Sequence, residues 1–170
     1  MYKVLVSDNI AQRGIDILKE NGIKVDFKPE QSRKELLKTI AEYDGIIVRS
    51  MTNLNKEALN KATKLKVVGR AGTGYDNIDL NEATKNGIFV FNTPTGNTIS
   101  AVEHSFALML SLSRNIAQAN QSLHNDIWNR KKYMGVELKG KTLGIIGLGR
   151  IGSRVARRAQ SFGMKVIAND

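Results

Sequence analysis

The stretch LGIIGLGRIG closes an apolar run with three glycines, Gly147, Gly149 and Gly152. In the order G-x-G-x-x-G, the first glycine permits a tight turn and the second lets the backbone approach a pyrophosphate. The third lets the following helix lie close to the strand. The amides at the N-terminus of that helix then face the anion. The spacing therefore predicts a dinucleotide-binding loop, with Arg150 and Ile151 along the pyrophosphate.

Asp170 ends the next apolar run, MKVIAND. A carboxylate at this place accepts hydrogen bonds from the ribose hydroxyls of a bound nucleotide and repels a 2'-phosphate. We therefore expect NAD, rather than NADP, as the cofactor. The alternative is that the three glycines only form a strand-to-helix turn and that Asp170 is a solvated residue.

Two further loops carry arginine at the predicted ends of strands. GRAGTGYDNIDL contains Arg70, Gly72 and Gly74, and VRSMT contains Arg49 and Ser50. Glycine-rich loops expose backbone N–H groups that bind anions, and α/β proteins bind ligands at the carboxyl ends of parallel strands. The two loops predict an anionic substrate. Ordinary strand-end turns with exposed arginines are the alternative.

The elements that position these loops follow an alternating pattern. Five short apolar runs are separated by helical patterns, of which two end in Asn-Gly, a helix C-terminal signal. The alternation predicts an α/β fold whose parallel sheet is covered on both faces. The five runs are YKVLVS, IKVDF, GIIVRS, LKVVGR and GIFVFN.

The pattern breaks at NTPTGN, which places a domain boundary after residue 97. Ser100 and Glu103 then have the spacing of a capping box at the start of a long helix. Because the first turns of this helix are apolar nearly all round, we expect it to be buried in a domain boundary or a subunit contact. A strand over TLGIIG, a helix from about Arg150 to Phe162 and a strand over MKVIAND follow.

The net charge of +10 is concentrated in the second part of the chain, where residues 98–170 carry 11 basic and 4 acidic side chains. A basic surface attracts nucleic acid whatever the fold. Stacking aromatic residues are not interleaved with these charges. We therefore expect no nucleic-acid partner.

The chain contains no cysteine, so disulfides and thiolate metal sites are excluded, as is usual in a reducing cytosol. Its longest apolar stretch is too short to span a bilayer. We expect a cytoplasmic protein without a membrane or metal partner. The two histidines, His104 and His124, lie at no useful spacing from a carboxylate pair and are poor candidates for a general base.

Three motifs in order, GRAGTGYDNIDL, FNTPTGNTISAVEH and GKTLGIIGLGRIG, together resemble the D-isomer-specific 2-hydroxyacid dehydrogenases, and the likeness covers essentially all 170 residues. The resemblance implies a flavodoxin-like substrate domain over residues 1–97 and the N-terminal part of a Rossmann NAD-binding domain over 98–170. It implies a homodimer formed through the helix that begins near Ser100. Within the family, it favours NAD-dependent oxidation of D-3-phosphoglycerate to 3-phosphohydroxypyruvate, the first step of serine biosynthesis.

The resemblance and the strand-end loops together give the expected site residues. The substrate-binding set is Arg49, Ser50, Arg70, Gly72, Thr73, Gly74 and Arg130. The cofactor-binding set is Thr73, Gly147, Gly149, Arg150, Ile151, Gly152 and Asp170. The family's catalytic Arg, Glu and His are expected beyond Asp170. We therefore expect no catalytic residue among the 170 and no dehydrogenase activity from this chain alone.

Two other functions stay open. Asn53 stands where relatives acting on phosphoglycerate often carry lysine, which leaves glycerate, hydroxypyruvate or another 2-hydroxy acid as the substrate. The superfamily also includes transcriptional corepressors, so an NAD-sensing binding module is the third alternative.

Overall fold

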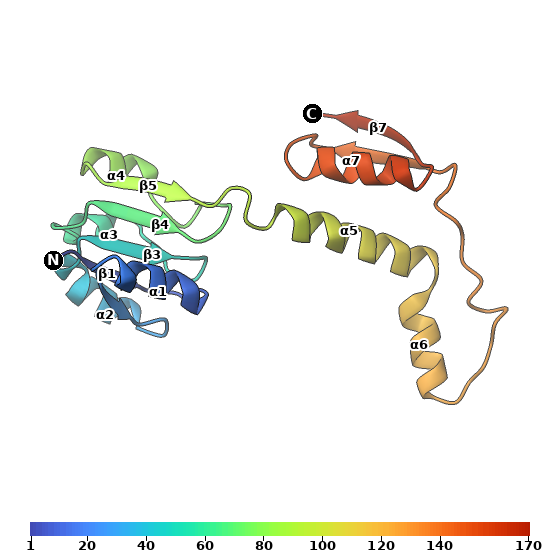
Figure 1. The fold of residues 1–170 in the computed structure, drawn as a ribbon, viewed down its shortest axis with the longest axis horizontal. Helices are drawn as coiled ribbons and strands as arrows, with labels where there is room; N and C mark the ends of the chain where they lie inside the picture. The colour runs from blue at the N-terminus through green and yellow to red at the C-terminus, as the bar shows by residue number, and fades with distance from the viewer. The chain divides into compact units, whose positions relative to one another are not determined.

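The computed structural model describes residues 1–170, which form two compact units, Met1–Gly96 and Asn97–Asp170 (Figure 1). Each unit contains its own parallel sheet, with helices packed against it. The predicted α/β class is confirmed.

The first unit is built on a five-stranded parallel sheet in the order β2-β1-β3-β4-β5. This is the strand order of flavodoxin-like doubly wound folds. Each strand falls within one of the five apolar runs, so the predicted strands are confirmed. The strands are β1 (Lys3–Val6), β2 (Lys24–Phe27), β3 (Gly45–Val48), β4 (Val67–Arg70) and β5 (Phe89–Asn92).

Local signals in the sequence set the ends of the connecting helices. Ser32 and Glu35 form a capping box at the start of α2. Gly22 and Gly87, with φ angles of 74° and 67°, follow α1 and α4 in the left-handed conformation that ends many helices. The helices are α1 (Gln12–Glu20), α2 (Arg33–Thr39), the 3₁₀ helix η1 (Ile40–Glu42), α3 (Lys56–Lys61) and α4 (Leu80–Lys85).

One face of this sheet carries the hydrophobic core. Alternate strand residues point into it and pack against α2, η1, α3 and α4; they include Leu5, Ile46, Val48 and Val68. The opposite face is packed less completely, because α1 lies along β2 while Phe89 and Phe91 on β5 stay 79% and 60% exposed. The expectation that helices cover both faces is therefore wrong for the β5 side of this unit.

A polar cluster closes the amino end of the sheet. The hydroxyl of buried Tyr43 donates to Asp26 at 2.9 Å, and the Lys3 ammonium lies 3.2 Å from Asp26 and 3.0 Å from Glu42. Burial and the hydrogen bond to Asp26 raise the pKa of Tyr43 to about 12. Burial raises the pKa of Asp26, but the bonds from Tyr43 and Lys3 outweigh it and hold that pKa below its usual value.

The second unit begins with two helices and ends in a strand-helix-strand motif. Strands β6 and β7 pair in parallel, and α5 packs on the crossover helix α7 (Figure 1). The rings of Phe106 and Phe162 stack with their centroids 5.3 Å apart. The predicted strands and crossover helix are confirmed. The elements are α5 (Thr98–Ser113), α6 (Ile116–His124), β6 (Thr142–Ile146), α7 (Gly152–Ser161) and β7 (Lys165–Asn169).

The start of the long helix differs from the prediction. Helix α5 begins at Thr98 after Asn97, so Ser100 lies inside the helix and the predicted capping box is wrong. The helical stretch is also interrupted, because Asn115 adopts the left-handed conformation (φ 53°) and α6 starts after it. None of the helices is long and apolar enough to cross a membrane.

Candidate functional site

The loop after β3 presents Arg49 and Ser50 at the carboxyl edge of the first sheet. Both residues are exposed. The Arg49 guanidinium donates to the carbonyl of Asn9 at 3.3 Å, and its backbone N–H donates to the carboxylate of Asp8 at 2.5 Å. Arg49 thus keeps further guanidinium N–H groups that can bind an anion.

The glycine-rich loop after β4 lies beside the Arg49 loop. Arg70 is the strand partner of Val48, and the N–H of Ala71 donates to the Val48 carbonyl at 2.8 Å. A side chain at Gly72 would collide with the guanidinium of Arg70 and would displace the end of that side chain from its present position. The structure therefore brings the Arg49 and Arg70 loops to one edge of the sheet.

The end of β5 holds the middle of the glycine-rich loop. The side-chain amide of Asn92 donates to the carbonyl of Thr73 at 2.6 Å, and the N–H of Thr93 donates to the carbonyl of Gly72 at 3.0 Å. Because Asn92 and Thr93 bind these two carbonyls, the path of residues 72–74 is fixed at two points. Gly72 and Thr73 are half-buried and Gly74 is exposed.

The second unit carries the G-x-G-x-x-G loop, and its three glycines differ in their surroundings. Gly147 has a φ angle of 91°, which few other residues adopt. A side chain at Gly149 would meet nothing within 4 Å, whereas one at Gly152 would collide with the carbonyl of Gly147. A tight turn, open backbone and close helix packing are the three features that a pyrophosphate-binding loop needs.

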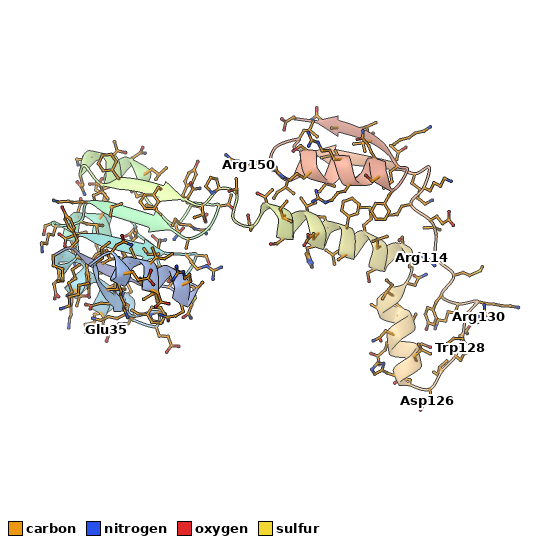
Figure 2. All side chains as sticks on the ribbon, in the orientation of Figure 1. Glu35, Arg114, Asp126, Trp128, Arg130 and Arg150 are labelled. Carbon is orange, nitrogen blue, oxygen red and sulfur yellow. The ribbon has the colours of Figure 1, made fainter.

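Asp170 contacts this loop directly. Its Oδ1 accepts a hydrogen bond from the N–H of Leu148 at 2.8 Å, and the neighbouring carbonyl of Asn169 binds the N–H of Gly147 at the same distance. The second carboxylate oxygen can accept a further hydrogen bond. Arg150 lies on the loop between β6 and α7 (Figure 2). Arg150 and the following Ile151 are both exposed.

Arg130 belongs to the second unit. It follows α6 on the same loop as Trp128 (Figure 2), and both border a cavity of about 430 Å³ that Arg114, Tyr133 and Met134 also line. Trp128 is 73% exposed. The predicted substrate residues are therefore divided between the two units, with Arg49 and Arg70 in the first and Arg130 in the second.

A polar cluster under the Arg49 loop was not anticipated from the sequence. Ser7 and Asp8 directly after β1 are buried; both bond to the Thr52 hydroxyl, and Asp8 alone also accepts from the backbone N–H of Arg49. The available signal was the change from apolar to polar residues in VLVSD, directly before the first loop. Clusters of His, Cys, Asp or Glu that could hold a metal are absent. Both histidines are exposed, and His124 hydrogen-bonds to the carbonyl of Asn120.

The chain is similar in sequence to a known family of dehydrogenases. Residues 4–159 match the family model of the D-isomer specific 2-hydroxyacid dehydrogenase catalytic domain. The chain is 49% identical over 168 residues to D-3-phosphoglycerate dehydrogenase of Archaeoglobus fulgidus and 51% identical over 167 residues to that of Bacillus subtilis. These alignments cover 99% and 98% of this chain but only 32% and 31% of the relatives. The chain thus spans about a third of their length.

Solved structures agree with the fold. The TT0316 protein of Thermus thermophilus superposes with a TM-score of 0.90 at 32% identity, covering 98% of this chain and 55% of the other. The NAD⁺-bound 3-phosphoglycerate dehydrogenase of Entamoeba histolytica superposes with a TM-score of 0.78 at 31% identity, covering 99% and 54%. The chain belongs to the D-isomer specific 2-hydroxyacid dehydrogenase family.

Proposed function

We propose that this chain forms the N-terminal part of an NAD-dependent dehydrogenase that oxidises D-3-phosphoglycerate to 3-phosphohydroxypyruvate. Residues 1–97 would carry the substrate loops and residues 98–170 the start of the NAD-binding domain. The observation that carries the proposal is the glycine loop, whose three positions have the geometry a dinucleotide requires. The names of the relatives at about 50% identity support the choice of substrate.

The residues of the first unit supply binding groups for an anionic acid. Arg49 and Arg70 provide guanidinium groups suited to a carboxylate or a phosphate. The N–H groups of residues 72–74 add a second kind of donor, and Arg130 is assigned to the substrate phosphate. NAD, when bound, accepts the hydride; Asp170 would orient its ribose, and Thr73 belongs to the proposed cofactor contacts.

We also propose that the protein forms a homodimer through α5. Large apolar side chains on α5, α6 and the loop after them are exposed, among them Leu108, Leu112, Leu123 and Trp128. Monomeric proteins seldom expose this many apolar side chains together on one segment. Burying them against a second copy would remove that surface from water.

An unphosphorylated 2-hydroxy acid is the second candidate substrate, and Asn53 favours it. Asn53 follows the Arg49 loop and brings no positive charge to it, while its carbonyl accepts a hydrogen bond from Arg33 at 2.6 Å. A lysine at this position would add one cation for a phosphate. The two candidates therefore differ in how strongly the phosphate contributes to binding.

A hybrid enzyme tests the proposal. It joins residues 1–170 to the remaining C-terminal part of the Bacillus subtilis relative, and the intact relative serves as the control. We expect NAD-dependent oxidation of D-3-phosphoglycerate with a kcat/KM well above that for D-glycerate. A folded hybrid that prefers glycerate would establish the second candidate. A hybrid that binds NAD but oxidises neither acid would contradict both.

A further inference from the structure

The turn from Arg49 to Thr52 is held by side chains that lie outside it. Asp8, at the end of β1, accepts hydrogen bonds through Oδ2 from the N–H groups of Arg49 at 2.5 Å and Thr52 at 3.2 Å. Its Oδ1 accepts from the Thr52 hydroxyl at 2.6 Å. One carboxylate therefore binds both ends of the turn.

Asn77 binds the same two residues through their carbonyl groups. Its side-chain amide donates to the carbonyl of Arg49 and to that of Thr52, each at 2.6 Å. Asn77 belongs to the loop that contains Gly72 and Gly74, so it joins the two loops of the sheet edge. At both Arg49 and Thr52, the backbone N–H is bound by Asp8 and the carbonyl by Asn77.

Both side chains are buried, and neither is directed at solvent. Asp8 is 2% exposed and forms no ion pair. A buried carboxylate is costly unless hydrogen bonds stabilise it, and three donors from the turn do so here. The Asn77 carbonyl oxygen is buried without a partner, so this amide contributes through its two donated bonds.

We propose that Asp8 and Asn77 are positioning residues that fix the Arg49 turn for an anionic substrate. This inference rests on the proposed role of Arg49 in binding that substrate. The Asp8 carboxylate would repel the anionic substrate if the two faced each other, but both Asp8 oxygens accept hydrogen bonds from the turn. Its contribution is to set the direction in which the Arg49 side chain leaves the backbone.

The test uses the hybrid enzyme carrying Asp8→Ala or Asn77→Ala. We expect either substitution to raise KM for the acid roughly tenfold, because a small displacement of a binding group is costly. We expect kcat to change little, since Arg49 would bind the acid equally well in the ground state and in the transition state. Asp8→Asn should restore KM, because its oxygen can accept both N–H groups and its amide can donate to the Thr52 hydroxyl.

Ser7→Ala is the matched control. The Ser7 hydroxyl contacts the Thr52 hydroxyl at 2.8 Å but neither backbone group of the turn, so this variant should keep the original KM. An equal rise in KM for Ser7→Ala would overturn the inference. So would an unchanged KM for both Asp8→Ala and Asn77→Ala.

A double substitution separates this inference from the proposed function. If Asp8 acts through Arg49, Asp8→Ala should raise KM no further in an Arg49→Ala background. An unchanged KM for Arg49→Ala alone would contradict the proposed role of Arg49. Arg49→Ala should itself raise KM. If adding Asp8→Ala to it raises KM by a further factor as large as Asp8→Ala causes alone, only the positioning role of Asp8 would be contradicted.

Amide exchange reports on the turn directly in the 170-residue chain. The N–H groups of Arg49 and Thr52 should exchange faster in Asp8→Ala, with the protection of β3 unchanged. If Asp8→Ala prevents folding, KM of the Asn77→Ala variant tests the proposal instead, because this substitution removes only the hydrogen bonds to the Arg49 and Thr52 carbonyls. An unchanged KM there would overturn the proposal.

Discussion

Asp170 is the residue to which we assign cofactor choice. In the hybrid enzyme, Asp170→Ala should weaken NAD binding about tenfold, because hydrogen bonds to a charged acceptor contribute roughly 1.5–3 kcal/mol. The substitution also removes the charge that would repel a 2'-phosphate, so the preference for NAD over NADP should relax. Dissociation constants for both nucleotides measure this. An unchanged preference would remove Asp170 from the cofactor site.

Arg130 is assigned to the substrate phosphate. Arg130→Ala in the hybrid enzyme should raise KM for D-3-phosphoglycerate about tenfold, because a charge-assisted hydrogen bond is lost. KM for an unphosphorylated acid should change much less. Lys131→Ala removes the neighbouring exposed charge and is the control. Equal effects of Arg130→Ala on both acids would point to a structural role for Arg130.

The residues of the site differ in how far the sequence could identify them. The glycine loop is local, since Gly147, Gly149 and Gly152 form a motif within six residues. Asp8 and Asn77 are not local, because they bond to Arg49 across 41 and 28 positions of the chain. Only the paired strands bring these residues together, and no short pattern contains them.

The strand-loop-helix element of the second unit allows a paired test of its glycines. Gly149→Ala should leave the thermal unfolding midpoint of the hybrid enzyme nearly unchanged, because the added methyl group meets nothing. It should still weaken NAD binding about tenfold, since the methyl occupies the approach of the pyrophosphate. Gly152→Ala should lower the midpoint, because its methyl collides with the Gly147 carbonyl. Equal midpoints for the two variants would contradict this assignment.

The sheet of the first unit has a pH-dependent contact at its amino end. The pKa of Tyr43 is raised to about 12, so the folded state holds this proton more tightly than the unfolded chain. The stabilisation is complete below the unfolded pKa of about 10 and is lost as the pH rises towards 12. Tyr43→Phe should therefore lower the free energy of unfolding near neutral pH by about 1 kcal/mol.

The same variant should show a weaker loss of stability above pH 10, because it no longer carries the ionising hydroxyl. Urea unfolding at several pH values measures both effects. Tyr75→Phe, which changes an exposed tyrosine, is the control. A parallel decline for the Tyr43→Phe variant and the unsubstituted chain would contradict the assignment.

Elements were easier to identify than their ends. The strands follow from apolar runs, whereas the start of α5 depends on the preceding turn, in which Gly96 bonds to the Thr93 carbonyl. The break after α5 depends on distant backbone. The carbonyl of Ser113 accepts from the N–H of Val136, and Gly135 packs so closely there that a side chain would collide. The sequence pattern of the helix does not contain that contact.

The two units should differ in stability when the 170-residue chain is studied by itself. The first has five paired strands and a core of fully buried side chains, whereas the second has a two-stranded sheet that leaves Ile146 and Ile167 exposed. Two-stranded sheets are marginal in water. Hydrogen exchange should show residues 3–92 better protected than residues 141–170. Equal protection of both regions in a monomer would contradict this prediction.

The coverage of the first sheet shows a limit of sequence reasoning at this scale. Alternating strands and helices correctly predict a parallel sheet. They do not predict how the helices divide between its faces, because that division depends on the path of each crossover. Phe89 and Phe91 are as apolar as core residues, so composition alone does not reveal that they are exposed.

The hydrogen bonds that fix the Arg49 turn leave its tip free to vary. Ser50 and Met51 take part in none of these hydrogen bonds, and Met51 is 84% exposed. Under the proposed function, substitutions at these two positions would change what an incoming acid meets without changing the loop that presents them. In the proposed enzyme, the residues that hold the turn would thus differ from those at which substrate preference can diverge, and the tip of the turn would be a place to begin redesign for other acids.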